Sequence, residues 1–387
     1  MRARARPASA FLVNRRESAD PTRRTLRLLV LASKPPGQSP SQRYRLEQWA
    51  PILSRDHRIT LDFAPFESEV LSTLLYHPGR VAQKAFWTVG DFARRGAVVP
   101  RSRRYDAVVV HREAALLGPA IYERLLAWTG KPIIYDFDDA IWSPGQAWKN
   151  GIFSRLHFTS KTSTICKLAA AVTVGNDYLA AYARERNANV FVIPSSIDLA
   201  TYPPIPEPAE DGKFVVCWTG STSTLVHFEH AREVLERLAT LIPLAVKVIC
   251  SVPPVRPIAG AEMRFVPWSA EREAEDVGSC HTGIMPLPDD EVSRGKGGMK
   301  LLQYMATGRP VVASPVGVNS QIIRPGENGL LAASADEWIE AIVSLYRDRT
   351  LRERLGREAR RTVEDQFSAT ISAAKFAGVV ERVLPYC

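Results

Sequence analysis

The chain has 387 residues, 45% of them hydrophobic, and a formal net charge of +9 at pH 7. This length predicts two or three domains, and no apolar run approaches the roughly 18 residues that a membrane-spanning helix needs. The five cysteines are odd in number and form no CxxC pair, which argues against a disulfide framework or a zinc site and favours a reduced, cytoplasmic protein.

Positive charge is concentrated at the start of the chain, where residues 1–27 hold eight arginines against Glu17 and Asp20. We interpret residues 1–24 as a disordered basic tail. The alternative is attraction to an anionic surface, and lipid suits it better than nucleic acid because no nucleic-acid-binding motif accompanies the arginines. The short apolar run after Arg23 and Arg24 carries Arg27, which favours a first β-strand over an export signal.

Residues 25–201 alternate between short apolar runs and helical patterns. The expected strands are 26–32, 58–64, 106–111, 132–137, 171–174 and 190–194. In the first helical stretch Ser39 is a candidate cap, and Leu46, Trp49 and Leu53 fall on one face. This alternation is typical of βαβ units, so the sequence predicts a parallel sheet covered by helices.

The pattern breaks at "YPPIPEPAEDG", residues 202–212, whose four prolines predict a linker. A second α/β series then fills 213–367. Its expected strands are 213–220, 244–252, 263–267, 282–287, 309–314 and 328–333, and its expected helices cover 225–240, a segment from Met299, 335–347 and 350–366. A last helix is expected at 369–383, with Ser368 as its cap. We therefore predict an α/β protein of two Rossmann-like domains with parallel sheets, whose ligand lies in the cleft facing the carboxyl ends of the strands.

One stretch, "GKGGMKLLQYMATGRPVVASPVG" from Gly295 to Gly317, combines glycines, lysines and a helix start. A glycine-rich approach to a helix N-terminus exposes backbone amides that suit phosphate. Lys296 and Lys300 place positive charge there, which costs about 0.3–1 kcal/mol unless an anion offsets it. Gln303, one turn further, suits a sugar or ribose hydroxyl. A merely solvated polar face is the alternative. Neither GxGxxG nor GxxxxGK[ST] is present, so dinucleotide and P-loop sites are not indicated.

The same stretch, extended as "GKGGMKLLQYMATGRPVVASPVGVNSQIIRPGENGLL", resembles the donor-binding core of family 4 glycosyltransferases of the GT-B fold, the type with a glycosyltransferase group 1 C-terminal domain. The segments "SQRYRLEQW", "YDAVVVHREAALLGP", "KPIIYDFDDAIW", "VTVGNDYLAAYA" and "CWTGSTST" resemble the family in the same order. The resemblance implies a nucleotide-diphosphate-sugar donor on the C-terminal domain, an acceptor on the N-terminal domain, retention of anomeric configuration, and a last helix that packs back on the N-terminal domain.

The resemblance also implies donor-binding residues. Gln303 stands at the second glutamate of the family's E-x7-E motif, which holds the ribose, while Gly295 stands at the first, where only Glu291 or Arg294 could substitute from the same loop. The implied donor set is Gly220, Ser221, Arg294, Lys296, Lys300, Gln303, Gly317 and Val318. The lysines would replace the basic residues that the family usually has after Gly220.

"DFDDA", residues 136–140, ends a strand of the N-terminal domain. The resemblance puts Asp138 where many members have a histidine near the sugar, so Asp138 would accept or orient the acceptor's proton, with His111 as a second catalytic candidate. Arg43, Glu113 and Asp139 are candidates for the acceptor site; pairing of the aspartates with arginines is the alternative. Asp136 and Asp138 have the spacing of a metal-binding DxD, but they lie in the wrong domain for the donor. We therefore expect no metal and no cofactor beyond the donor.

Residues 71–104 mix apolar and aromatic residues such as Phe86 and Trp87 with five arginines between positions 94 and 104. A basic segment with aromatics suits an anionic membrane surface, whereas a helix packed on its own domain is the alternative.

Together these features predict a retaining hexosyltransferase-type glycosyltransferase that acts on a lipid-linked or cell-surface glycan precursor. It would be cytoplasmic and peripheral at the inner face of the cytoplasmic membrane. Its partners would be the nucleotide sugar, the glycan acceptor and an anionic membrane surface, with no nucleic acid. A catalytically inactive homologue that binds sugar nucleotide or glycan as an assembly partner, and a sugar-nucleotide epimerase of the same fold, remain as alternatives.

Overall fold

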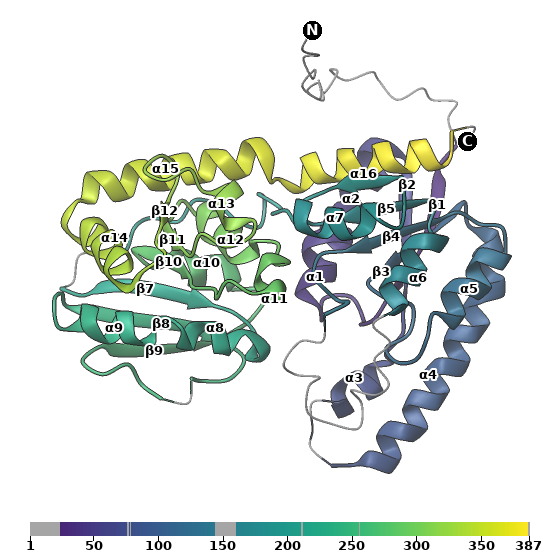
Figure 1. Cartoon of the computed structure of the whole chain (residues 1–387), viewed down its shortest axis with the longest axis horizontal. Helices are drawn as coiled ribbons and strands as arrows, with labels where there is room; N and C mark the ends of the chain where they lie inside the picture. The colour runs from purple at the N-terminus through teal and green to yellow at the C-terminus, as the bar shows by residue number, and fades with distance from the viewer. Residues whose placement is uncertain are drawn as a thin grey trace, which may run out of the picture.

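The structure is a computed structural model that describes residues 24–75, 77, 79–143, 160–209, 212–254 and 256–385. The predicted basic tail lies outside the described residues, except for Arg24. Figure 1 shows two α/β domains side by side, with the last two helices running along one edge of both.

The N-terminal domain is built on a six-stranded parallel sheet, ordered β2-β1-β3-β4-β5-β6. Its strands are β1 (Leu26–Ala32), β2 (Ile59–Pro65), β3 (Ala107–His111), β4 (Ile133–Phe137), β5 (Ala171–Val174) and β6 (Val190–Val192). Each lies within a residue or two of its expected position. The β3, β4 and β5 strands are buried along their whole length, as their continuous apolar sequences predict.

The first helical stretch of this domain is continuous but changes its winding. It consists of α1 (Pro40–Gln42), a π-helical turn η1 (Arg43–Glu47) and α2 (Gln48–His57). Ser39 is the N-cap residue, as expected, but its side chain makes no capping hydrogen bond. The remaining helices are α3 (Glu69–Leu75), α4 (Val81–Arg101), the 3-10 turn η2 (Ser102–Arg104), α5 (Ile121–Trp128), α6 (Ser160–Leu168) and α7 (Asp177–Arg184). The π turn widens the helix where Arg43, Tyr44 and Arg45 point into the molecule.

The C-terminal domain repeats the plan with the strand order β12-β11-β10-β7-β8-β9, again parallel. Its strands are β7 (Phe214–Thr219), β8 (Leu244–Cys250), β9 (Glu262–Pro267), β10 (Thr282–Met285), β11 (Val311–Ala313) and β12 (Leu330–Leu331). Its helices are η5 (Thr222–Thr224), α8 (Leu225–Glu229), α9 (Arg232–Ala239), α10 (Glu273–Gly278), α11 (Glu291–Arg294), α12 (Met299–Ala306), α13 (Asn319–Ile322), α14 (Ala335–Arg347) and α15 (Arg349–Gln366). The helix expected over 225–240 is therefore two helices.

Two segments connect the domains. The proline-rich segment after β6 is fixed on the C-terminal domain: the Ile205 amide donates to the Thr307 carbonyl at 3.1 Å, and Arg352 pairs with Glu207 at 2.5 Å. The last helix, α16 (Ala369–Val383), is capped by Ser368 and packs on α2, where the Trp49 and Phe376 rings are 5.7 Å apart. The chain therefore crosses between the domains twice, and the cleft lies between them.

Candidate functional site

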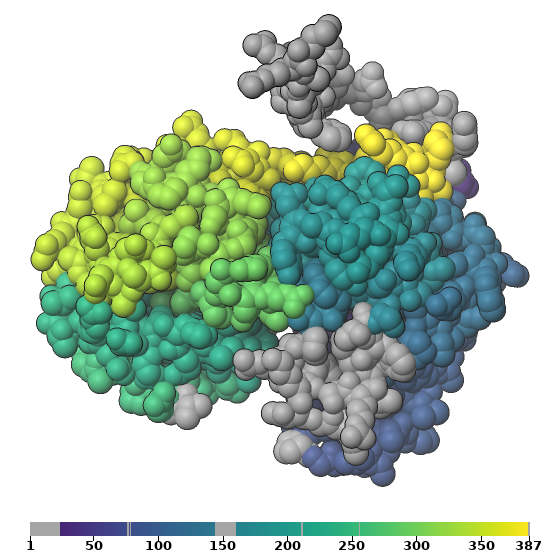
Figure 2. Space-filling model, in the orientation of Figure 1, coloured from purple at the N-terminus to yellow at the C-terminus, as the bar shows by residue number. Residues whose placement is uncertain are grey.

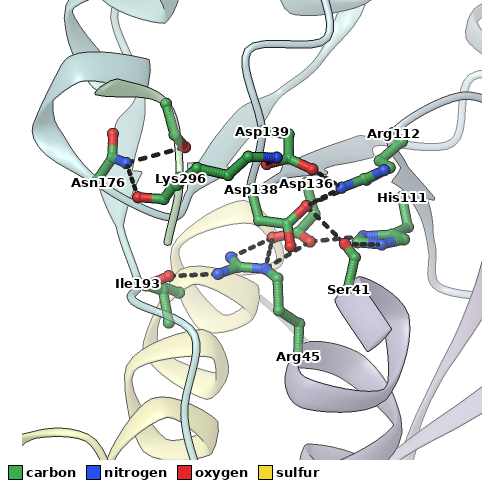
Figure 3. Close-up of polar contacts among 11 residues, drawn as sticks. Ser41, Arg45, His111, Arg112, Asp136, Asp138, Asp139, Asn176, Ile193 and Lys296 are labelled. Atoms are coloured by element: carbon green, nitrogen blue, oxygen red, sulfur yellow. Dashed lines mark hydrogen bonds and ion pairs between the residues drawn. The ribbon is translucent and has the colours of Figure 1, made fainter. Parts of the chain in front are cut away.

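The two domains meet where the carboxyl ends of β3, β4 and β5 face the loop before α12. In the loop after β5, the Asn176 side chain donates to the carbonyl oxygens of Gly295 and Lys296 at 3.2 and 3.1 Å. The Lys296 ammonium lies 3.2 Å from Asp139 of the other domain. Figure 3 shows these contacts beside a denser cluster around Asp136. The "DFDDA" segment and the glycine-rich segment therefore form one site.

Asp136 is the buried anchor of this cluster. Its carboxylate is fully buried and accepts hydrogen bonds from Arg45 at 2.6–3.2 Å, from Thr173 at 2.6 Å and from His111 Nδ1 at 2.8 Å. Burial alone would raise the pKa of Asp136, but the charge of Arg45 and the hydrogen bonds from His111 and Arg45 hold it below its usual range. Because these donors occupy both oxygens, the geometry does not favour the alternative in which Asp136 is a metal ligand.

Asp138 lies above this anchor, at the mouth of the cluster. Its Oδ1 accepts from Ser41 Oγ at 2.6 Å and from two nitrogens of Arg112 at 3.0 and 3.1 Å. Ser41 Oγ is also 3.0 Å from His111 Nε2. Among the described residues, no donor reaches Oδ2 of Asp138. One oxygen is therefore fixed by the protein and the other is left for a ligand.

Arg112 connects both aspartates that follow β4. It also pairs with Asp139, and burial, which would lower the pKa of Arg112, is outweighed by Asp138 and Asp139, which raise it. Its backbone φ is 61°, in the left-handed region that side chains other than glycine seldom adopt. Such strain persists only where surrounding contacts fix it, and it is frequent at functional sites.

Gly295, the position of the family's first glutamate, is packed too tightly for any side chain. A Cβ atom there would lie 2.8 Å from the Cβ and 2.9 Å from the amide nitrogen of Ala140 in the other domain. Neither suggested substitute is directed to the cluster. Glu291 accepts from Trp142 and Ser143 at 3.0 Å each, and Arg294 pairs with Asp289 at 2.7 Å. This departure from the family therefore has a steric reason.

Lys300 lies in the first turn of α12, with its ammonium 5.5 Å from the centre of the Trp218 ring. Burial and the neighbouring Lys296 lower the pKa of Lys300 to about 8. The pKa of His227 in α8 is lowered to about 4 by burial, then by Lys300 and Lys296. This side of the cleft therefore concentrates positive charge, as a site for a diphosphate would.

The two loops expected to offer amides to the donor differ. In the first, the Gly220 amide donates to the Ile249 carbonyl and the Ser221 amide to Thr224 Oγ1, each at 3.0 Å, so these two amides are already used. In the second, Gly317 (φ 56°) and Val318 line a cavity of about 340 Å³ together with Arg294 and Asn176. The second loop fits the expectation better than the first.

Gln303 and Arg43, expected to bind ligands, instead join the two domains through Glu273. The Glu273 carboxylate accepts from Arg43 at 2.6 Å, from Tyr44 at 2.7 Å and from Gln303 Nε2 at 2.8 Å. Gln303 also donates to the hydroxyls of Tyr44 and Tyr202. We call Arg43, Tyr44, Tyr202, Glu273 and Gln303 the Glu273 cluster. In this arrangement, neither Gln303 nor Arg43 is directed at a ligand.

Glu113 is the remaining expected acceptor residue, and it is held in an ion pair with Lys161 of α6 at 2.9 Å.

The sequence did not predict four residues of the site: Ser41, Arg45, Arg112 and Thr173. All four stand inside segments that resemble the family, "SQRYRLEQW", "YDAVVVHREAALLGP" and "VTVGNDYLAAYA". A buried aspartate on β4 also requires a cation nearby. That requirement was the available signal for Arg45.

Comparison with known proteins agrees with this architecture. Residues 256–348 match the model of the family described as glycosyl transferases group 1. No curated protein sequence matches the chain at a significant level. Among solved structures, a glycosyltransferase from Rickettsia africae aligns with a TM-score of 0.66 at 14% identity, over 94% of this chain and 100% of that one.

Two further structures cover nearly the whole chain. HepE of Anabaena, in complex with UDP and glucose, aligns with a TM-score of 0.63 at 15% identity, over 92% of this chain and 100% of that one. Sucrose-phosphate synthase of Thermosynechococcus elongatus aligns with a TM-score of 0.60 at 16% identity, over 94% of this chain and 100% of that one. The fold is therefore the two-domain GT-B fold.

The family match over residues 256–348 and the GT-B fold of the whole chain agree with the resemblance seen in the sequence. No helix among the described residues is long and apolar enough to cross a membrane.

Proposed function

We propose that this protein transfers a sugar from a nucleoside-diphosphate sugar to a hydroxyl of a lipid-linked or cell-surface glycan precursor, with retention of anomeric configuration. The donor's diphosphate lies near Lys296, Lys300 and the Gly317 loop, and the acceptor lies over Asp138. HepE, a neighbour of the same fold, was solved with UDP-glucose, which supports a nucleotide sugar as donor.

The observation that carries the proposal is the contact between Lys296 and Asp139. It brings the ammonium group of Lys296 in the proposed donor loop within 3.2 Å of Asp139, the residue that follows Asp138. A sugar attached to a diphosphate at Lys296 would therefore lie beside the open Oδ2 of Asp138. Donor phosphate, anomeric carbon and acceptor hydroxyl would then be close together, which is the main requirement for a transfer reaction.

The test begins with thermal shift of the whole protein against UDP-, GDP- and ADP-sugars. A ligand at about 100 times its dissociation constant stabilises a protein by roughly 2.7 kcal/mol, so the preferred base should be clear. Release of the nucleoside diphosphate and NMR of the anomeric proton of the product then report turnover and stereochemistry. Tight binding without transfer or hydrolysis would favour the inactive homologue, and a change of sugar configuration on the nucleotide would favour the epimerase.

We further propose that the reaction needs no metal, because lysines and backbone amides neutralise the leaving diphosphate. Lys296 and Lys300 supply this charge at the start of α12, where the helix dipole adds to it. Turnover should be unchanged by EDTA. Loss of turnover that Mn²⁺ restores would contradict this proposal and return Asp138 to a metal-binding role.

The acceptor's anchor is proposed to lie in an anionic membrane surface that contacts the exposed end of α4. Val81, Phe86 and Val89 are 69–75% exposed there. Phe86 also lines a groove of about 470 Å³ between α3 and α4, together with Val70, Leu74, Arg80, Ala82, Gln83 and Trp87. Figure 1 shows α3 and α4 at the lower end of the N-terminal domain, and in Figure 2 the blue surface at that end belongs to α4.

The arginines expected to bind the membrane surface do not lie at this apolar end of α4. Arg101, Arg103 and Arg104 are exposed but lie at the opposite end of α4, about 30 Å from Val81 by the rise of the helix. Arg95 is buried and Arg94 pairs with Asp91. The replacement Phe86→Ser should therefore weaken binding to anionic vesicles more than Arg103→Ser, as measured by sedimentation at low salt. Equal binding of both variants and the wild type would contradict the membrane proposal.

A further inference from the structure

Both polar contacts of Ser41 can be hydrogen bonds only if the site holds one proton more than a neutral His111 and an ionised Asp138 would carry. Ser41 Oγ has one hydrogen and two close polar partners, Asp138 Oδ1 at 2.6 Å and His111 Nε2 at 3.0 Å. It can donate to only one of them, so the other partner must donate to Ser41. This extra proton lies either on His111 or on Asp138.

The surroundings of Asp138 decide which partner receives the Ser41 hydrogen. Asp138 Oδ1 already accepts from two nitrogens of Arg112, at 3.0 and 3.1 Å, and such charge-assisted bonds favour the ionised carboxylate. Asp138 therefore accepts the Ser41 hydroxyl hydrogen. His111 Nε2 must then carry a hydrogen and donate it to Ser41.

The other ring nitrogen of His111 faces a second carboxylate. Nδ1 lies 2.8 Å from Asp136 Oδ2, and Asp136 is held in its ionised form by Arg45. Nδ1 must donate as well. The groups that face the ring are thus Asp136 on one side and Ser41, Asp138 and Arg112 on the other. Both nitrogens carry hydrogen, and the ring is an imidazolium.

We propose that Ser41 is the positioning residue of this site, bridging a charged His111 to an ionised Asp138; the inference rests on the proposed glycosyl transfer. Asp138 is the group that touches the acceptor, through its open Oδ2. Ser41 donates to Oδ1 and accepts from His111, which fixes the orientation of the Asp138 carboxylate that Arg112 keeps ionised (Figure 3).

The transfer step then balances. The acceptor O–H bond breaks and its proton passes to Asp138 Oδ2, while the acceptor oxygen forms a bond to the anomeric carbon. The bond from that carbon to the diphosphate oxygen breaks, and its electron pair leaves with the nucleoside diphosphate. Asp138 returns its proton to water after the product leaves. Ser41 and His111 move no atom of the substrate, so their removal should affect turnover through the orientation of Asp138.

The direct test is ¹⁵N NMR of the whole protein labelled at its seven histidines, with His111 assigned from the spectrum of His111→Gln. At neutral pH both ring nitrogens of His111 should be protonated. In Ser41→Ala, Nε2 loses its acceptor and should become unprotonated, whereas Ser41→Thr keeps the hydroxyl and should keep the charged ring. An unprotonated Nε2 in the wild type overturns the inference. A charged ring in both wild type and Ser41→Ala overturns the bridging role of Ser41.

Kinetics with the preferred donor complete the test. Because a hydrogen bond to a charged group is removed, Ser41→Ala should lower kcat about tenfold to a hundredfold with an unchanged KM for the donor, and Ser41→Thr should restore most of it. A loss of the same size in KM, or no rescue by threonine in a normally folded variant, contradicts the positioning role. If the wild type transfers no sugar, the proposed function fails, yet the NMR result still decides where the proton lies.

Discussion

The two sides of the cleft differ in how their charges are compensated. On the N-terminal side, Asp136 pairs with Arg45, and Asp138 and Asp139 share Arg112, all within hydrogen-bonding distance. On the C-terminal side, burial and Lys296 lower the pKa of Lys300, and burial with both lysines lowers the pKa of His227. One side is balanced without a ligand, and the other has more positive than negative charge.

This difference indicates what each side lacks. A balanced network holds its side chains in one arrangement, which suits a site that must orient a neutral hydroxyl. A lysine whose pKa is lowered by a neighbouring lysine marks a favourable place for an anion, because a bound diphosphate would offset the repulsion and raise the pKa of Lys300. The acceptor side is preorganised, and the donor side is completed by its ligand. The predictions below change one side at a time.

The largest effect is expected on turnover, from Asp138→Asn. An amide keeps the size of the side chain and a contact with Arg112 but cannot take a proton, and general base catalysis is worth roughly 10²–10⁴ in rate. Donor affinity should change little, because the donor's charge is held by the other side of the cleft. Asp336→Asn, which alters an exposed acid of α14, is the control and should leave kcat unchanged. Wild-type turnover in Asp138→Asn would make Asp138 a structural residue.

The next largest effect is expected on stability, from Arg45→Met. Methionine fills much of the space of the arginine but leaves Asp136 buried without its main cation, which typically costs 3–5 kcal/mol. Urea unfolding measures the loss. The matched control is Arg55→Met, which breaks the exposed pair with Asp56 and should change the midpoint little. Equal midpoints for the two variants would mean that the network around Asp136 is not preorganised by charge.

Asp138 and Arg45 also show how much of the site can be predicted from the sequence. The strand that ends at Phe137 was predictable from its apolar run, and the cleft-facing position of Asp138 follows from the parallel sheet. A cation near the buried aspartate was predictable, but which side chain pairs with which aspartate was not. Arg45, His111 and Arg112 come from different elements and meet only after the sheet and the π turn have formed. Local sequence patterns predict which residues follow the end of a strand. They do not predict which side chains from other elements will pair with those residues.

On the other side of the cleft, the helix from Met299 and its glycine approach were predictable, yet the direction of Gln303 was not. Spacing put Gln303 one turn from Lys300, but Lys300 faces Trp218 while Gln303 faces Glu273. Glu273 begins α10, a helix that contains no recognised motif. Nothing in the sequence therefore predicted that Gln303 would donate a hydrogen bond to this carboxylate. The steric reason for Gly295 likewise required the position of Ala140 in the other domain.

Substitutions in the Glu273 cluster distinguish two interpretations of Gln303: that it joins the two domains, or that it binds the ribose of the donor. If Gln303 joins the domains, Gln303→Glu places a second carboxylate beside Glu273 and removes a hydrogen bond to a charged group, which should cost about 1.5–3 kcal/mol of stability. The double change Gln303→Glu with Glu273→Gln reverses the pair and should recover most of that loss in thermal unfolding. If Gln303→Glu is as stable as wild type and binds donor equally well, Gln303 holds the ribose as in the family.

A smaller effect is expected on donor affinity, from Lys300→Ala. A charge-assisted hydrogen bond contributes roughly 1.5–3 kcal/mol, part of which Lys296 can replace, so we expect a loss of about tenfold for the nucleoside diphosphate. Calorimetry measures it, and Lys213→Ala, which breaks the exposed pair with Glu262 in the same domain, is the control. Unchanged affinity in Lys300→Ala would mean that the polar face of α12 is merely solvated.

The smallest effect is a dependence of donor affinity on pH, and it follows from the low pKa of Lys300. In the free protein this pKa is about 8, lowered by burial and by Lys296, whereas a bound diphosphate would raise it. The protonated form is the one that binds, so the affinity for a nucleoside diphosphate should be full below pH 8. It should fall by up to tenfold per pH unit above pH 8, until the pKa of the bound state is reached. Lys300→Arg stays charged throughout and should remove this decline. Titrations between pH 7 and 9 check this, and the same decline in Lys300→Arg would assign it to another group.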